Sequence, residues 1–375
     1  MQSCYRVLIV GLGNLGRMFY THFMGTRHVL NLFSDRLRSL PILILYLTDG
    51  CNSRCVTCDI WRNPRRNMRA DLIDSLVVQV KPLGIRWVVL SGGEAMQHPD
   101  WAGIAQRFRV QGARVLLLTN GLLIRKQIDD VIASVDEVIV SLDGGTAATY
   151  EAIRGVDGFD LIMDGIRHVR AAGIPVTTRT TVQRANFREI PTIIDVCKTA
   201  DVNHISFLTV DVSNPVAFGD RFASDTSIPM MSGLAPSEHQ PPTTALTSDD
   251  VRELAGILDE VERHYTDEFV SGRIAESPLK LRHMLTYFGA LNNQSTFPRV
   301  RCNTPQLSAV VEVDGSLRPC YFLPKMGNVN DGGLNVSINT SEALALRAAV
   351  RDGERAECER CVCPLYKGAL ALARL

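Results

Sequence analysis

Short apolar runs and amphipathic segments follow one another in a regular order between residues 42 and 211. The runs are rich in Val, Ile and Leu, which is typical of buried parallel strands. We predict six strands: Ile42–Thr48, Trp87–Leu90, Val115–Thr119, Val138–Leu142, Val176–Val182 and His204–Thr209. Segments of helical period separate them: Ala70–Val80, Pro99–Val110, Ile124–Ser134, Phe159–Ala171 and Arg188–Thr199. Six strand–helix units predict an α/β fold, a partial or complete barrel, with its ligand site where the strands end.

The rhythm stops after the sixth strand. Residues 212–248 are rich in Pro, Ser, Thr and Gly, which predicts a flexible connector or, alternatively, a lid over the barrel mouth. Residues 249–301 follow as a helical linker, with helices expected over Asp249–Tyr265 and Ser277–Leu291. The tail, 302–375, should open with a hairpin that turns at Gly315 and joins Ala309–Asp314 to Leu317–Phe322.

Composition narrows the possible partners. The 40 basic and 40 acidic residues cancel, so the chain has no broad field to recruit nucleic acid or anionic lipid. No apolar run approaches the roughly 18 residues of a membrane span, and the N-terminus lacks the pattern of a signal peptide. We therefore expect a cytoplasmic protein without nucleic-acid or membrane partners.

The ten cysteines are unevenly placed. Cys4 and Cys197 stand alone, and we expect Cys197 to be buried in a helix. The others form two groups: Cys51, Cys55 and Cys58, and then Cys302, Cys320, Cys358, Cys361 and Cys363. Grouped cysteines in a reducing compartment are more often metal ligands than disulfides.

The first group places three thiolates within eight residues, directly after the first strand. Thiolates are the usual ligands of iron–sulfur clusters. Three ligands leave one iron of a four-iron cluster open for a cofactor or substrate. A zinc site is the alternative, and it would require a fourth Cys or His, which is not found nearby in the sequence. The spacing favours iron–sulfur.

Several motifs in sequence order carry a family resemblance. Cys51-x3-Cys55-x2-Cys58 resembles the signature of the radical S-adenosylmethionine (SAM) superfamily, and Ser91-Gly-Gly-Glu94 resembles its GGE motif. Ser141-Leu-Asp-Gly144 and Tyr150-Glu-Ala-Ile-Arg-Gly155 are similar to segments of the anaerobic sulfatase maturases and the pyrroloquinoline quinone maturase. The resemblance implies a partial (β/α)6 barrel over residues 42–211 that binds a [4Fe–4S] cluster and SAM.

The resemblance also implies roles for single residues. Glu94 would accept the ammonium group of SAM, Arg154 would pair with its carboxylate, and Gly92 and Gly93 would let the backbone approach it closely. The full set expected at the cofactor is Gly92, Gly93, Glu94, Asn120, Ser141, Asp143, Arg154 and Arg179.

Other polar residues of the barrel strands have less specific expectations. Arg179 should point into the barrel toward SAM or substrate. We expect His204 to be a core residue and Asp211 to approach the substrate.

One position departs from the family pattern. Thr57 precedes the third cysteine, where the family has an aromatic residue that lies near the adenine. Ile60 or Trp61 is expected to cover that face instead.

The second group resembles the SPASM and twitch auxiliary-cluster domains. Five cysteines fall short of the seven in a full SPASM domain, which favours one auxiliary [4Fe–4S] cluster. The expected ligands are Cys302, Cys320, Cys358 and Cys361, with Cys363 as a rival for the last place. A zinc ribbon is the alternative.

The N-terminal extension, residues 1–41, contains Gly11-Leu-Gly13-Asn-Leu-Gly16, with Asp35 where a ribose-binding acid would follow. This stretch leaves space only for a strand–helix–strand fragment, so we expect a packing extension rather than an NAD site.

The resemblance implies an enzyme that cleaves SAM reductively and removes hydrogen from a small metabolite or a peptide, for a two-electron oxidation or another modification. An electron donor such as flavodoxin or ferredoxin would be its partner. A peptide maturase that forms a cross-link is the alternative within the family. A zinc-bound scaffold and an NAD-dependent oxidoreductase are the alternatives from other classes.

Overall fold

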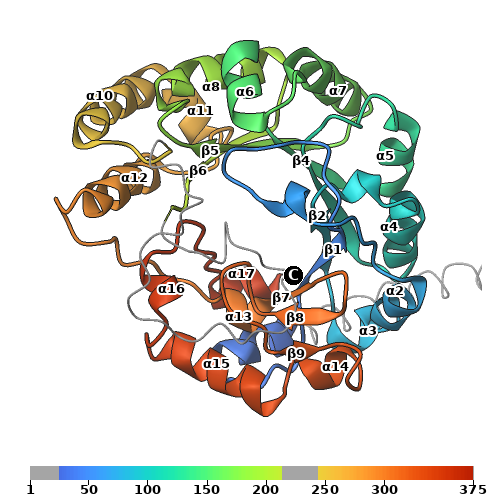
Figure 1. The fold of residues 1–375 in the computed structure, drawn as a ribbon. Coiled ribbons are helices and arrows are strands. Elements are labelled where there is room, and N and C mark those ends of the chain that lie inside the picture. Colours follow the sequence, from blue (N-terminus) through green and yellow to red (C-terminus); the bar gives the residue numbers. More distant parts are fainter. Residues whose placement is uncertain (1–24, 213–243, 375) are drawn as a thin grey trace, which may run out of the picture.

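A computed structural model describes residues 25–212 and 244–374 of the chain. Its core is a nine-stranded sheet in the order β6-β5-β4-β3-β2-β1-β7-β8-β9 (Figure 1). The six parallel strands are β1 (Ile42–Thr48), β2 (Trp87–Gly92), β3 (Arg114–Thr119), β4 (Glu137–Ser141), β5 (Val176–Val182) and β6 (His204–Thr209). Because β6 does not pair back onto the sheet, the predicted partial barrel is confirmed.

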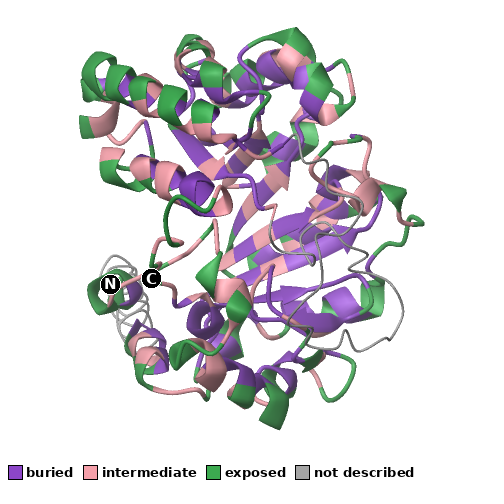
Figure 2. Cartoon of the chain, turned by 60° about the vertical axis from the view of Figure 1, so that its left-hand side comes forward, coloured by how far each residue is buried: buried purple, intermediate pink, exposed green. Residues whose placement is uncertain are grey.

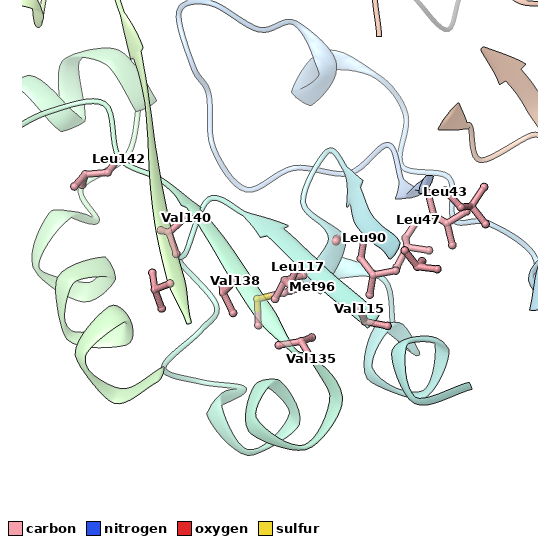
Figure 3. Packing of buried hydrophobic residues seen from close by; sticks show 14 of the residues in the cluster. Leu43, Leu47, Leu90, Met96, Val115, Leu117, Val135, Val138, Val140 and Leu142 are labelled. Atoms are coloured by element: carbon pink, nitrogen blue, oxygen red, sulfur yellow. The ribbon is translucent and has the colours of Figure 1, made fainter. Parts of the chain in front are cut away.

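Helices cover the convex side of this sheet (Figure 1). They are α2 (Ala70–Val77), α3 (Val80–Leu83), α4 (Trp101–Val110), α5 (Ile128–Ser134), α6 (Ala147–Arg154), α7 (Phe159–Ala171) and α8 (Ile190–Thr199). Alternate strand residues such as Val115, Leu117, Val138 and Val140 are fully buried beneath them (Figure 3). The residues between these, which face the inside of the barrel, are only partly buried (Figure 2). The inside of the barrel is therefore the face open to ligands.

Helix α5 begins at Ile128 rather than at Ile124, and two larger differences from the prediction occur near residues 80 and 150. The helix expected over residues 70–80 ends at Val77, and a separate helix starts at Val80. This break places Pro82 in the first turn of α3, where its missing N–H costs no hydrogen bond. The helix α6 was not expected.

The C-terminal part continues the same sheet. Helices α10 (Ser248–His264), α11 (Thr266–Val270) and α12 (Pro278–Leu291) follow on the β6 side. The hairpin turns at Gly315 as predicted, with φ of 84°, but its strands β7 (Ser308–Val311) and β8 (Ser316–Arg318) are shorter than expected. The short strand β9 is Gly327–Asn328. Strand β7 runs parallel to β1, which was not predicted.

Short helices surround this hairpin: α13 (Thr304–Leu307), α14 (Leu334–Ser337), α15 (Ser341–Arg351), α16 (Ala356–Glu359) and α17 (Ala369–Ala373). None of the helices in the described ranges has both the length and the apolar character that a bilayer crossing requires.

The segment before β1 is bound to α15. The Arg351 guanidinium lies 2.6 and 2.5 Å from the two carboxylate oxygens of Asp35, and the buried Arg347 donates to the Asp35 carbonyl at 2.7 Å. Asp35 therefore serves a packing contact, in line with the expected packing extension. The glycine motif at residues 11–16, Cys4 and residues 213–243 of the connector or lid lie outside the described residues.

Candidate active site

The three N-terminal cysteines lie in one loop whose two ends are joined. This loop, residues 49–67, connects β1 to α2. The Asp49 N–H donates to the Arg66 carbonyl at 3.0 Å, and the Arg66 Nε lies 2.7 Å from Asp49 Oδ2. Thr48 also pairs with Asn67 as an isolated bridge. The carboxylate of Asp49 is fully buried, so a charge-assisted contact closes the base of the loop.

The C-terminal end of α6 holds the middle of the loop. The N–H groups of Arg54 and Val56 donate to the carbonyls of Arg154 and Ile153, both at 2.9 Å. Gly155 ends the helix in the left-handed region, with φ of 66°. A Cβ at Gly155 would lie 2.5 Å from the Arg54 carbonyl oxygen. Glycine is therefore needed there both for the helix end and for the close approach of the cysteine loop.

Arg154 is directed at the cysteines by Asp143. Its Nη2 lies 2.7 Å from Asp143 Oδ2, and its Nη1 lies 3.6 Å from Cys55 Sγ. Burial alone would lower the pKa of Arg154, but the charges of Asp143 and Cys55 raise it above its ordinary value. Asp143 Oδ1 accepts a further bond from the Thr181 N–H at 2.6 Å. Arg154 is a fixed, permanently charged group beside the expected cluster.

The GGE motif packs against the cysteine loop. A Cβ at Gly93 would lie 2.3 Å from the Gly50 carbonyl oxygen, and one at Gly92 would lie 2.5 Å from that of Thr48. These glycines therefore allow close packing against the backbone of the cysteine loop. This is a second reason for glycine here, besides the expected approach to SAM. The Glu94 side chain is 1% exposed and accepts bonds from Thr119 Oγ1 at 2.9 Å and the Asn120 N–H at 2.7 Å.

Burial raises the pKa of Glu94, although these bonds and one from the Met96 N–H act in the opposite direction. Both carboxylate oxygens therefore have partners within the protein. Glu94 thus lies at the site, and its side chain links the end of β2 to the end of β3 through hydrogen bonds from Thr119 and Asn120.

Asn120 supports the loop from the β3 side. Its Nδ2 donates to Asn52 Oδ1 at 2.8 Å and to Ser53 Oγ at 3.1 Å, and it lies 3.8 Å from Cys51 Sγ. Such bonds orient a ligand and tune the metal it holds.

A cavity of about 570 Å³ opens beside Cys51. Its other lining residues are Asn52, Arg54, Trp61 and Arg62. The Trp61 Nε1 is buried without a hydrogen-bond partner among the described residues. Of the two residues expected to replace the missing aromatic, Trp61 lines this cavity.

The N-terminal thiols fit an iron–sulfur cluster. Burial raises the pKa of Cys51 to about 12, with the charges of Glu94, Cys55 and Cys58 adding to the effect. Metal binding to such a thiol releases its proton. Within the described residues, no three Cys, His, Asp or Glu side chains are arranged to hold a single metal ion. In a four-iron cluster each thiolate binds a different iron, so the sulfurs need not converge on one point.

The C-terminal cysteines gather at a second site. Burial raises the pKa of Cys320 and of Cys358 to about 12, and the charges of Cys361 and Cys302 contribute to both shifts. The N–H groups of Phe322 and Leu323 bond to Cys320. A side-chain hydrogen bond with Cys363 and burial raise the pKa of Cys361, whereas a bond to the Cys363 backbone lowers it. All five cysteines are therefore close neighbours, and Cys361 is less exposed than Cys363.

Five other residues have definite positions. Asp211 is buried and acts electrostatically on Cys361, which places the end of the barrel beside the second site. Cys197 is buried against Thr178 as expected. Arg179 and Ser141 are partly exposed on the inside of the barrel. The expectation for His204 is wrong: it is exposed, because it begins the edge strand β6, and its Nδ1 lies 2.9 Å from the Gly272 carbonyl oxygen.

Sequence reasoning missed three contributors to the site. Gly155 and the Asp49–Arg66 pair hold the cysteine loop, and Thr181 holds Asp143. The signals in the sequence were the position of Asp49, directly before the loop that carries the cysteines, and that of Gly155 at the end of a family motif.

Comparisons with known proteins agree with this geometry. The profile of the radical SAM superfamily matches residues 45–197, and that of the SPASM iron–sulfur cluster-binding domain matches residues 302–362. The AdoMet-dependent heme synthase of Methanosarcina barkeri is 34% identical over 194 residues, which cover 49% of this chain and 54% of that protein. The chain thus spans about half the length of this relative. A probable GTP 3′,8-cyclase of Saccharolobus islandicus is 27% identical over 299 residues, 76% of this chain and 84% of the relative.

Solved structures show the same fold. The structure described as native anSMEcpe with bound AdoMet and Cp18Cys peptide has a TM-score of 0.60 at 17% identity, over 87% of this chain and 89% of that one. Streptococcus suis SuiB bound to its precursor peptide SuiA has a TM-score of 0.61 at 14% identity, over 91% and 75%. Together with the cysteine loop and its supports, the two profile matches confirm the resemblance: the chain contains a radical SAM domain over residues 45–197 and a SPASM domain over residues 302–362.

Proposed function

We propose that the chain binds a [4Fe–4S] cluster through Cys51, Cys55 and Cys58 and uses it to modify a substrate inside the barrel. When bound, the cluster supplies the electron that cleaves SAM to methionine and a 5′-deoxyadenosyl radical, which removes a hydrogen atom from the substrate. The observation that carries this proposal is the position of Arg154, whose Nη1 lies 3.6 Å from Cys55 Sγ. A permanent cation beside a three-cysteine loop is suited to a carboxylate that binds next to the fourth iron.

Each residue of the site contacts or positions a different part of SAM. Arg154 orients the carboxylate, and Asp143 is a positioning residue that fixes Arg154. The backbone of Gly92 and Gly93 forms the floor under the methionine part. Ser141 faces the ribose, and Trp61 covers the adenine. Glu94 acts through the backbone that it holds, since both of its oxygens have protein partners.

The second site holds one auxiliary [4Fe–4S] cluster. Its ligands are Cys302, Cys320, Cys358 and Cys361, all of which lie within the matched SPASM range, whereas Cys363 lies just beyond it. When bound there, the cluster would supply an electron acceptor, which would make the overall change a two-electron oxidation. Direct binding of the substrate and a purely structural role are the competing possibilities.

The substrate is a small molecule or a peptide. The names of the relatives include a heme synthase and a GTP cyclase, and SuiB and anSMEcpe were solved with peptides. A peptide cross-link is the second candidate reaction, and SuiB with its precursor peptide is the comparison that favours a peptide substrate. We further propose that the protein works in the cytoplasm with flavodoxin or ferredoxin as its electron donor, without nucleic-acid or membrane partners.

Anaerobic reconstitution tests the proposal. The loaded protein should contain iron and sulfide and should release 5′-deoxyadenosine from SAM when dithionite is added. The Cys51→Ala variant should release none. Cys197→Ala is the matched control, because it removes a buried thiol from α8 that contacts Thr178 instead of the cysteine loop.

Metal analysis separates the alternatives. Protein that contains zinc and no iron after air-free loading would contradict the proposal and support the scaffold. Saturable NADH binding would support the oxidoreductase alternative. Release of 5′-deoxyadenosine by Cys51→Ala at the wild-type rate would remove the assigned cluster site.

A further inference from the structure

An arginine on the inside of the barrel has no partner among the residues that the structure describes. Arg179 lies in the middle of β5, and its Nε is buried without a hydrogen bond. Its side chain forms no hydrogen bond or ion pair with residues 25–212 or 244–374. A buried polar group without a partner is costly and indicates a ligand that is bound in use.

The direction of Arg179 follows from its neighbours on β5. Thr178 faces outward, because its hydroxyl lies 3.3 Å from Cys197 Sγ of the outer helix α8. Successive strand residues point to opposite faces, so Arg179 faces the inside of the barrel. Figure 2 shows the same alternation as bands of buried and partly buried residues along the strands.

The surroundings of Arg179 offer hydroxyl groups. It lies in register with Ser141 of β4 and Ser206 of β6, and Thr177 and Thr181 share its face of β5. The Ser206 hydroxyl donates to Glu276 Oε1 at 3.0 Å, and Glu276 Oε2 accepts from the Phe207 N–H at 2.9 Å. Both oxygens of this carboxylate therefore have partners, and within the described residues no ion pair joins Glu276 to Arg179.

The level of Arg179 in the barrel separates it from the cofactor arginine. Thr181 lies two residues further toward the mouth and donates to Asp143, which fixes Arg154 beside Cys55. Arg179 lies opposite Ser141 in the β4–β5 register, one row of side chains deeper in the barrel than the contact between Thr181 and Asp143. A group held by Arg179 therefore lies below the carboxylate of SAM, within the barrel.

We propose that Arg179 is an anion subsite for the substrate, which carries a carboxylate or a phosphate group. The planar fork of a guanidinium matches two oxygens of either group, and the Thr181 hydroxyl, on the same face of β5, is a further donor. The inference rests on the proposed function, because it assigns the chemical class of the substrate of that same site.

Calorimetry on the anaerobically loaded, SAM-bound protein tests the subsite. The probes are pyrophosphate and tricarballylate, with mannitol as a neutral control. Wild-type protein should bind one anion per chain and no mannitol. Arg179→Ala should weaken anion binding at least about tenfold. Arg179→Lys should fall between the two, because it keeps the charge without the fork.

Arg114→Ala is the matched control, since this exposed arginine begins β3 at the opposite end of the barrel and stacks on Trp87. It should bind the probes as the wild type does. Arg179→Lys keeps the test valid if Arg179→Ala fails to fold.

Two kinds of result would overturn the inference. Absence of probe binding to the wild type, or equal binding by the Arg179 variants, overturns the inference. A loss of SAM affinity in Arg179→Ala as large as the loss of anion binding overturns it too, because Arg179 would then hold the cofactor.

The failure of this inference can be told apart from failure of the proposed function. Anion binding that depends on Arg179, in protein that releases no 5′-deoxyadenosine, leaves the subsite standing while the proposed function fails. Release of 5′-deoxyadenosine, with anion binding that does not depend on Arg179, removes the subsite alone.

Discussion

Substitution of Gly155 by alanine tests how the cysteine loop is held. Gly155 ends α6 with φ of 66°, and an added Cβ would lie 2.5 Å from the Arg54 carbonyl oxygen. Gly173, after α7, has φ of 80° and nothing within 4 Å of an added Cβ. Gly173→Ala is therefore a matched control that introduces the left-handed strain without the collision.

The magnitudes follow from these contacts. An alanine in the left-handed region costs about 1–2 kcal/mol of the free energy of unfolding, and both variants should lose this amount. Because the collision partner is backbone, the loop must move away in Gly155→Ala, which breaks the bonds from the N–H groups of Arg54 and Val56. Two such bonds are worth about 1–3 kcal/mol together, so this variant should lose about 2–5 kcal/mol.

Urea unfolding of both variants measures the free energies, and iron content with 5′-deoxyadenosine release measures the site. Gly173→Ala should keep its iron and its SAM cleavage. Gly155→Ala should lose most of both, because the displaced segment carries Cys55. Equal stability of the two variants, with iron retained in both, would refute the reasoning that α6 positions the loop.

Four further outcomes are expected. Asn120→Ala removes the donor beside Cys51, and iron loss to a chelator should become about 10- to 100-fold faster. Cys320→Ala should still release some 5′-deoxyadenosine; complete loss would show that the second site is not separate. Burial and the charges of nearby arginines lower the pKa of His28 from 6.5 to about 4, so the unfolded chain takes up this proton first as the pH falls. Wild-type stability, measured by urea unfolding, should therefore decrease by up to about 3 kcal/mol between pH 6.5 and 4, and His28→Gln should remove that slope. Asp35→Ala should change stability by at most about 1 kcal/mol, because its partner Arg351 is half exposed, and titration with NADH should show no saturable binding in either form.

Local pattern predicted much of the barrel. The bounds of β1, β5 and β6 agree with the predicted ones, because apolar and β-branched residues make up most of each strand. Arg179 was expected inside the barrel because a charge in an otherwise buried strand tends to face the interior, and the outward position of its neighbour Thr178 agrees. The helix over residues 147–154 escaped prediction, since Tyr150 and Arg154 were considered only as parts of a motif.

Contacts between distant segments could not be predicted in the same way. Nothing within the Gly-Gly-Glu run indicates that these glycines pack on the carbonyls of Thr48 and Gly50. The carboxylate of Glu94 looked free for SAM, but its two oxygens meet Thr119 and Asn120 from another strand. These contacts join the segments that follow β1, β2 and β3. The sequence of any one segment does not show which of the others it will meet.

The pairing of β7 with β1 has a consequence for synthesis of the chain. The register places Leu43 opposite Ala309 and Leu45 opposite Val311. One edge of β1 therefore stays unpaired until residues more than 260 positions later have been synthesised. Until then a strand of sequence Ile-Leu-Ile-Leu-Tyr-Leu presents unpaired backbone groups, the kind of edge on which chains aggregate. The nascent barrel therefore depends on its own C-terminal hairpin, or on a chaperone in the meantime, to remain a single molecule.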